Sequence, residues 1–328
     1  AEALLREHLA AVPTDVAALR MMAELAARIG RQEDAERLLE RCLELSPGFL
    51  AARQNYALVL HRGNKPREAL AQVDTLLAAE PRNPNYRNLK AVVLCRTGDY
   101  EQAIELYDGI LREHPGQAKI WLSQGHALKT AGHTGRAIAA YRRSLDLDPS
   151  CGEVWWSLAN LKTFRFSDAD VAAMQAQLAR PGLSPEDLQH LHFALGKAME
   201  DRTDYAASFG HYGRGNALRR AQLHYSADDT TARVEKIEST YTSGFFAARA
   251  GAGATAPDPI FVLGLPRAGS TLVEQILSSH SAVEGTMELP EVISITRELR
   301  KLGEAGQSLP YHDVLASLEP ARLRELGE

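Results

Sequence analysis

The sequence predicts a mostly α-helical protein, in which a solenoid of helix pairs precedes the start of an α/β domain with a phosphate-binding loop. Two observations lead to this fold class. Prolines and small residues recur every 34 residues through the first half of the chain, as in stacked helical repeats. Near residue 264, a short apolar segment runs into a glycine-containing turn and then into helical periodicity, which is the order strand, loop, helix.

Length and composition limit the possible classes of protein. The 328 residues suffice for about two or three domains of ~100–200 residues. A net charge of −5 gives no reason to expect nucleic-acid binding, and no apolar run approaches the ~18 residues that span a bilayer. Cys42, Cys95 and Cys151 lack CxxC spacing, which favours a reducing compartment. We therefore predict a cytoplasmic protein without a metal site.

Three sets of residues share one 34-residue register. The first set consists of prolines: Pro13, Pro47, Pro81, Pro115 and Pro149. The second contains only small residues: Ala23, Ala57, Ala91, Gly125 and Ala159. The third is also small, with a weaker fifth member: Ala35, Ala69, Ala103, Ala137 and Val171. Small residues allow two helices to cross closely, and proline follows a helix because it cannot continue one.

The clearest copy of this unit runs from residue 118 to 149, "AKIWLSQGHALKTAGHTGRAIAAYRRSLDLDP". It closely resembles the tetratricopeptide repeat family, whose signature places are occupied by Trp121, Gly125, Ala137, Tyr141 and Pro149. Four repeats are clear, and a fifth begins near Gly152 and then decays. A degenerate sixth follows, in which Gly196 takes the small-residue place. We predict a superhelix of about five to six repeats over residues 1–220.

A row of basic residues is predicted on the first helices of the repeats, which line the concave face of such a superhelix. The predicted peptide-groove residues are Arg20, Arg28, Arg62, Arg96, Lys119 and Lys129. Glu24 is the one acidic residue predicted on the same face. Two interpretations remain open: an ordinary solvated helix face, or a groove for an acidic protein or peptide, because aligned charges raise the local positive potential.

Residues 221–256 are predicted to form a helix and a linker, because glycines and prolines interrupt the helical pattern. Residues 257–328 then begin a second domain. Residues 260–263 are short and apolar, which predicts a buried parallel strand. From Thr271 onward the apolar residues return at helical spacing.

Gly264 and Gly269 stand where a Walker A loop has its two glycines, but Ser270 occupies the place of the essential lysine. The missing lysine argues against nucleotide triphosphate hydrolysis. What remains is a helix N-terminus with the hydroxyls of Ser270 and Thr271 and the charge of Arg267. These groups suit a smaller anionic ligand.

The segment "PIFVLGLPRAGSTLVEQILSSHSAVEGTMELPEV" resembles the opening of a sulfotransferase that uses 3′-phosphoadenosine 5′-phosphosulfate (PAPS). The nearest group is bacterial and fuses tetratricopeptide repeats to a domain similar to tyrosylprotein sulfotransferases. The family's phosphosulfate loop, Pro-Arg-Ser-Gly-Thr-Thr, corresponds here to Pro266, Arg267, Ala268, Gly269, Ser270 and Thr271. Ala268 loses one side-chain donor, whereas Ser270 keeps the hydroxyl. The resemblance implies that these residues bind PAPS, with Arg267 also catalytic and no metal required.

The resemblance also implies a glutamate that acts as general base. An ungapped count from Arg267 places it at Glu288, with Glu284 as the competing candidate. The implied activity is sulfuryl transfer to an acceptor hydroxyl, while the repeats bind the acceptor or a partner. The acceptor stays open between a protein tyrosine, a sugar and a small phenol. The family's residues for the 3′-phosphate have no counterpart in residues 257–328, so we expect an incomplete sulfotransferase domain. Two alternatives stay open: a repeat scaffold with an inactive nucleotide-binding domain, and a nucleotide kinase with an unusual P-loop.

Overall fold

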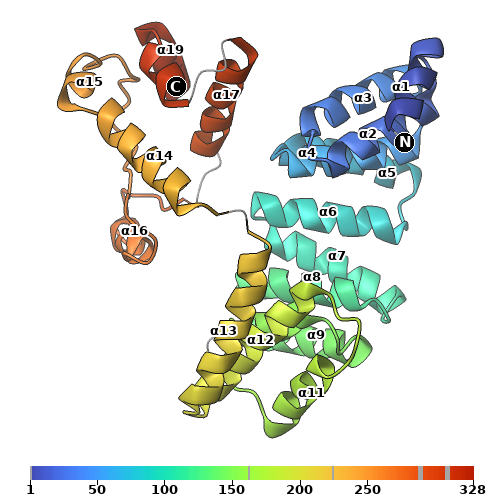
Figure 1. The fold of residues 1–328 in the computed structure, drawn as a ribbon. Helices are drawn as coiled ribbons and strands as arrows, with labels where there is room; N and C mark the ends of the chain where they lie inside the picture. Colours follow the sequence, from blue (N-terminus) through green and yellow to red (C-terminus); the bar gives the residue numbers. More distant parts are fainter. Residues whose placement is uncertain (1, 162, 224, 287–290, 307–310) are drawn as a thin grey trace. The chain divides into compact units, whose positions relative to one another are not determined.

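The computed structural model describes residues 2–161, 163–223, 225–286, 291–306 and 311–328. It divides the chain into two compact units, Ala1–Leu223 (unit 1) and His224–Glu328 (unit 2). Figure 1 shows the helices of the two units. In the described residues, no helix combines the length and the apolar character needed to cross a membrane.

Unit 1 contains the helices α1 (Glu2–Ala11), α2 (Val16–Arg28), α3 (Gln32–Leu45), α4 (Leu50–Arg62), α5 (Pro66–Ala79), α6 (Pro84–Thr97), α7 (Tyr100–Glu113), α8 (Ala118–Thr130), α9 (Thr134–Leu147), α10 (Gly152–Ala159), α11 (Asp168–Leu178), α12 (Pro185–Asp201) and α13 (Tyr205–Ala221). Their starts repeat the sequence period. The first helices of the repeats begin at residues 16, 50, 84, 118 and 152, and the second helices at 32, 66, 100, 134 and 168. Each helix pair packs on the next (Figure 1). The predicted tetratricopeptide-like solenoid is confirmed.

The small residues lie where the two helices of a repeat cross. Ala23, Ala57 and Ala91 are fully buried, as are the alanines of the third set at positions 35, 69, 103 and 137. A Cβ atom added at Gly125 would lie 2.4 Å from Cε1 of Tyr141, the buried aromatic residue of α9. Larger side chains at these positions would force the helices apart.

The turns between repeats carry a fourth regularity, which the sequence analysis missed. The carbonyl oxygens of three of the periodic prolines each accept a side-chain hydrogen bond from the residue six positions later. Arg53 donates to Pro47 O (2.7 Å). The indole Nε1 of Trp121 donates to Pro115 O (2.9 Å) and that of Trp155 to Pro149 O (3.0 Å). These bonds tie the starts of α4, α8 and α10 to the turns before them.

The degenerate end of the solenoid keeps the same close helix crossing. A Cβ atom added at Gly196 of α12 would lie 2.6 Å from the ring of Tyr212 on α13, and Ser208 Oγ donates to the Gly196 carbonyl (2.8 Å). The predicted small-residue role of Gly196 is confirmed by this geometry. In the fifth repeat α10 spans only eight residues, which accounts for the decay seen in the sequence.

Unit 2 contains α14 (Ala227–Thr240), α15 (Ser243–Ala247), α16 (Ser270–Ser278), α17 (Glu291–Gly306), α18 (Tyr311–Ser317) and α19 (Pro320–Gly327). Two hydrogen bonds join α14 and its C-terminal cap to α18: Lys236 Nζ donates to Asp313 (2.6 Å), and Tyr241 Oη lies 2.9 Å from His312 Nδ1. The region predicted as helix and linker therefore contacts the C-terminal helices of the same unit. The predicted domain limits at residues 220 and 256 stay predictions.

The predicted strand at residues 260–263 is wrong. These residues have neither helical nor strand structure, and the side chains of Ile260, Phe261 and Leu263 are 60%, 74% and 88% exposed. A strand needs a hydrogen-bonded neighbour, and no segment of the described residues pairs with this one. The apolar pattern that predicted a buried strand is present, but within the described residues these side chains are exposed.

Candidate functional site

The predicted cofactor residues form one continuous turn at the N-terminus of α16. The amide of Ala268 donates to Leu265 O (3.0 Å) and closes the turn. Arg267 and Gly269 both adopt left-handed backbone conformations, with φ angles of +69° and +90°. For a non-glycine residue such as Arg267 this conformation costs about 1–2 kcal/mol. Strained residues of this kind are found preferentially at binding sites.

The polar groups of this turn are free to bind a ligand. Gly269 is the N-cap of α16, so no side chain caps the first amides, and no acidic residue lies in the first turn. The hydroxyls of Ser270 and Thr271 and the guanidinium of Arg267 are exposed and have no hydrogen-bond partner in the described part of the chain. Uncapped amides at a positive helix end, two hydroxyls and one cation are suited to an anion of phosphate or sulfate size.

Of the two candidate general bases, the structure describes one. Glu288 lies outside the described residues. Glu284 is exposed and adjoins Gly285, where an added Cβ would lie 2.9 Å from Cβ of Ser278, the last residue of α16. The chain after α16 therefore folds back against the C-terminal end of this helix. Nine helical residues, about 13 Å, separate that end from the loop, and Glu284 follows that end in the chain.

His280 has a structural contact in the turn after α16. Its ring Nδ1 accepts a hydrogen bond from the amide of Ala282 (3.1 Å), which stabilises the turn that leads to Gly285. Among the described residues, no group of three or more His, Cys, Asp or Glu side chains could hold a metal ion. The loop thus offers amides, hydroxyls and one arginine as its ligand-binding groups.

The predicted groove residues differ in how far their charges are neutralised. Arg20 lies 3.5 Å from Glu24, one turn further along α2, so its charge is partly compensated. The other five form no ion pair within the described residues: Arg28, Arg62, Arg96, Lys119 and Lys129. Arg96 makes one contact with a neutral group, donating to Asn64 Oδ1 at 3.2 Å.

His61 lies half-buried on α4 and responds to these charges. Burial lowers its pKa, and the positive charges of Arg96 and Arg62 lower it further. Its Nδ1 has no hydrogen-bond partner within the described residues. Arg62 and Arg96 themselves form no ion pair with a carboxylate among the described residues.

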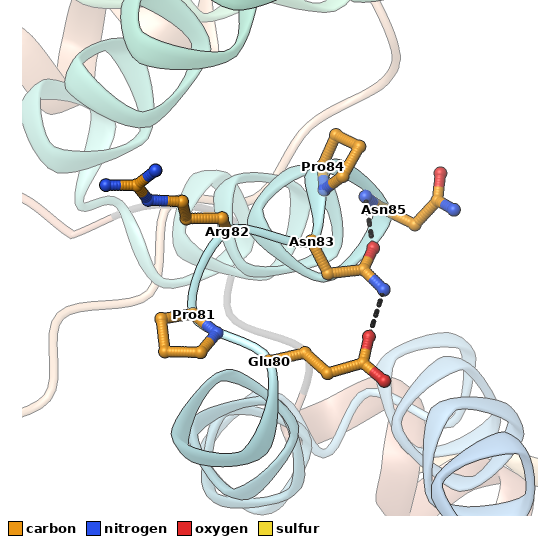
Figure 2. A pocket seen from close by; sticks show the side chains of 6 residues that line it. All are labelled: Glu80, Pro81, Arg82, Asn83, Pro84 and Asn85. Carbon is orange, nitrogen blue, oxygen red and sulfur yellow. Dashed lines mark hydrogen bonds between the residues drawn. The ribbon is translucent and has the colours of Figure 1, made fainter.

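Two hollows in unit 1 lie away from these groups. Figure 2 shows the first, at the turn between α5 and α6, where Asn83 Oδ1 accepts from the Asn85 amide (3.0 Å) and Asn83 Nδ2 donates to Glu80 (2.6 Å). Its polar groups are used in capping α6. The second is an apolar groove between α1, α2 and α3, with Leu9, Met22 and Ile29 among its lining residues. The arginines at its edge are mostly paired with Glu2 and Asp34.

Comparison with protein families gives the site its context. Residues 259–323, which include the loop and α16, match the sulfotransferase family model. Residues 57–118 and 122–183 match a tetratricopeptide repeat model. The chain therefore combines predicted tetratricopeptide repeats, which match a repeat model, with a segment that matches the sulfotransferase family model.

Individual relatives are distant. An uncharacterized protein of Aquifex aeolicus is 26% identical over 218 residues, which are 66% of this chain and 28% of that protein. The chain thus spans little more than a quarter of that relative. Among solved structures, MamA from Desulfovibrio magneticus RS-1 gives a TM-score of 0.40 at 17% identity, covering 64% of this chain and 97% of MamA. YrrB, described as a TPR protein with an unusual peptide-binding site, gives 0.41 at 14% identity, covering 63% and 96%.

Proposed function

We propose that this protein is a sulfotransferase, which transfers a sulfuryl group from PAPS to an acceptor hydroxyl. We propose protein tyrosine as the acceptor. One observation carries the proposal: the turn Pro266 to Thr271 presents unpartnered anion-binding groups inside the segment that matches the sulfotransferase family. The loop amides and hydroxyls fit an anionic phosphosulfate, which supports PAPS as the donor.

The roles of the residues follow from the chemistry. Sulfuryl transfer depends on positioning and charge stabilisation more than on covalent catalysis. The amides of Ser270 and Thr271, with their hydroxyls, would hold the 5′-phosphosulfate. Arg267 would stabilise the negative charge that grows on the leaving phosphate as the sulfur–oxygen bond to it breaks. Glu288 would accept the proton of the acceptor hydroxyl while that oxygen bonds to sulfur.

The repeats would bind the acceptor. Five basic groove residues without ion pairs favour an acidic segment, and we propose that the acceptor tyrosine lies in such a segment. Surface charges of this kind raise the association rate and make binding sensitive to salt. An interaction scaffold without catalysis is the second candidate, since the same basic face would serve it equally well.

The donor site is tested by calorimetric titration with 3′,5′-adenosine bisphosphate. Arg267→Ala should weaken binding about tenfold or more, because a charge-assisted hydrogen bond is lost. Arg233→Ala is the matched control, since Arg233 is exposed on α14 of the same unit and should leave binding unchanged. Equal affinity of the two variants would remove Arg267 from the site.

The base is tested by turnover. Glu288→Gln should reduce sulfuryl transfer by ~10²–10⁴-fold with little change in donor affinity. Glu284→Gln should keep its activity, because Glu284 adjoins the end of α16 opposite the loop. Loss of activity in Glu284→Gln alone would move the role to that residue. Binding of an acidic peptide together with no detectable transfer would favour the scaffold.

The acceptor groove is tested with an acidic tyrosine peptide. Binding should weaken as salt rises, and changing Arg62, Arg96 and Lys129 together to glutamate should abolish it while helix content stays the same. If neither salt nor the triple substitution affects binding, the basic face is only a solvated surface.

A further inference from the structure

Three arginines occupy one position in three consecutive repeats. Arg28, Arg62 and Arg96 follow each other at steps of 34 residues, and each stands in the last turn of a first helix, α2, α4 or α6. We call them the arginine row. Position 130, one step further, is Thr130, so the row ends after three members.

In the described part of the chain, the members of the arginine row lack acidic partners, whereas several other arginines of the solenoid are paired. Within the described residues, none of its three members forms an ion pair. Five arginines on the second helices do form ion pairs: Arg37, Arg41, Arg136, Arg142 and Arg143. The exposed row therefore keeps its full charge, while the rest of unit 1 neutralises much of its own.

His61 responds to the charge of the row. His61 lies beside the middle of the row, and both Arg62 and Arg96 contribute to lowering its pKa, after burial. The one side-chain contact of Arg96 is with the neutral amide oxygen of Asn64. A ligand that reaches the row thus meets three cations that form no ion pair among the described residues.

The spacing of the row limits the ligand. Because α2, α4 and α6 contact one another in sequence, neighbouring members of the row are separated by about one helix packing distance, ~8–10 Å. A polyproline II segment has three residues per turn and a rise of ~3.1 Å per residue. Its side chains at i, i+3 and i+6 therefore point in one direction at steps of ~9 Å. A β-strand returns to the same face every second residue, at ~7 Å, which is shorter than the row requires.

We propose that the arginine row binds an extended, polyproline II-like acidic segment with carboxylate side chains at every third residue, one for each arginine. The proposal rests on the proposed function in that the segment would flank the acceptor tyrosine. The binding itself requires no catalysis, so the two can be tested separately.

The experiment compares four tyrosine-containing peptides of the same composition and net charge, measured with the whole chain by fluorescence anisotropy. The three glutamates stand at i, i+3 and i+6 in the first peptide and at i, i+2 and i+4 in the second. They are consecutive in the third, and at i, i+7 and i+14 in the fourth, where they would line one face of a helix. The first peptide should bind about tenfold more tightly than the others, since each matched surface pair adds a small amount.

Two variants locate the effect. Arg62→Gln removes the middle member and should abolish the preference for the three-residue spacing. Arg67→Gln is the matched control, because Arg67 is also exposed but lies on the second helix α5, and it should keep the preference. Equal binding of all four peptides would overturn the spacing proposal and leave an acidic groove in place. Preference for the fourth peptide would replace the extended segment with a helix. If no peptide binds while adenosine bisphosphate still binds unit 2, the proposed binding by the arginine row is wrong. The proposed donor site would then still stand.

Discussion

The substitution Gly125→Ala tests the helix crossing on which the whole solenoid depends. The added methyl group would lie 2.4 Å from Cε1 and 2.6 Å from Cδ1 of Tyr141, distances that a Cβ atom essentially never shows to its neighbours. Tyr141 cannot simply move away. Its side chain is fully buried, and its hydroxyl lies 3.1 Å from His126 Nδ1, so a shift of the ring would disturb both the packing and this hydrogen bond.

Two opposing effects set the magnitude. Overpacking a filled core costs about 1–3 kcal/mol, whereas replacing a helical glycine by alanine gains up to ~1 kcal/mol. The net loss in the free energy of unfolding should be about 1–2 kcal/mol for Gly125→Ala, and larger for Gly125→Leu. Urea unfolding followed by circular dichroism measures it as a lower midpoint with an unchanged slope.

Gly135→Ala supplies the control with the opposite sign. Gly135 lies in α9 of the same repeat, and a Cβ atom there would meet no other atom within 4 Å. The propensity gain should therefore appear alone and raise the free energy of unfolding by about 0.5–1 kcal/mol. If Gly125→Ala also raised the midpoint, the two helices would not cross at Gly125 as described, and the repeat register would be refuted.

Three further predictions concern unit 1. Trp155→Phe removes the indole donor to Pro149 O and should lower the free energy of unfolding by about 0.5–1.5 kcal/mol in urea titrations, with the near-ultraviolet signal confirming a native fold. Asn83→Ala removes the N-cap of α6 and should cost ~1 kcal/mol by the same assay. His192 and His211 lie with their Nδ1 atoms 3.0 Å apart, and the pKa of each is lowered, by burial first. The unfolded chain then takes up protons first as pH falls below ~6.5, so stability should decrease from pH 7.5 to 5.5, and His211→Gln should weaken that dependence.

The helical repeats were predictable because one constraint acts on each of them in the same way. Each repeat must bury the same small residues at the same crossing, so the period in the sequence is also the period of the helix starts. The bonds from Arg53, Trp121 and Trp155 to the proline carbonyls were not predictable. Two residue types with different chemistry fill one position there, and their shared partner is a backbone atom that carries no sequence signal.

The candidate loop was predictable as a turn and a helix start, but not as part of a sheet. The turn at residues 264–269 requires local conformations only, and Arg267 and Gly269 adopt left-handed conformations before α16. A strand at residues 260–263 depends instead on neighbours distant in the chain, which its own pattern cannot supply. The choice of Glu288 as the base stays a prediction, because Glu288 lies outside the described residues.

The charges of the groove show why a pattern of basic residues alone does not identify a binding surface. Arg20 and Arg62 both belong to the predicted groove, but Arg20 lies 3.5 Å from Glu24, whereas Arg62 has no acidic partner within the described residues. Only the structure separates a charge used inside the protein from one available to a ligand. That distinction reduces the predicted groove to fewer positions and leaves the arginine row as its regular part.

At the end of the solenoid, the close helix crossing is kept although the repeat sequence is mostly lost. Gly196 and Tyr212 are separated by 16 residues, as are Gly125 and Tyr141, and in both pairs an added Cβ atom would lie less than 3 Å from the ring. The hydroxyl contacts differ: Tyr212 donates to Glu200, whereas Tyr141 lies near His126. What is retained is therefore the space between the helices and not the polar contact. Because a helix can pack on the next pair only if this spacing is kept, α12 and α13 extend the solenoid even though most of the repeat signature has been lost.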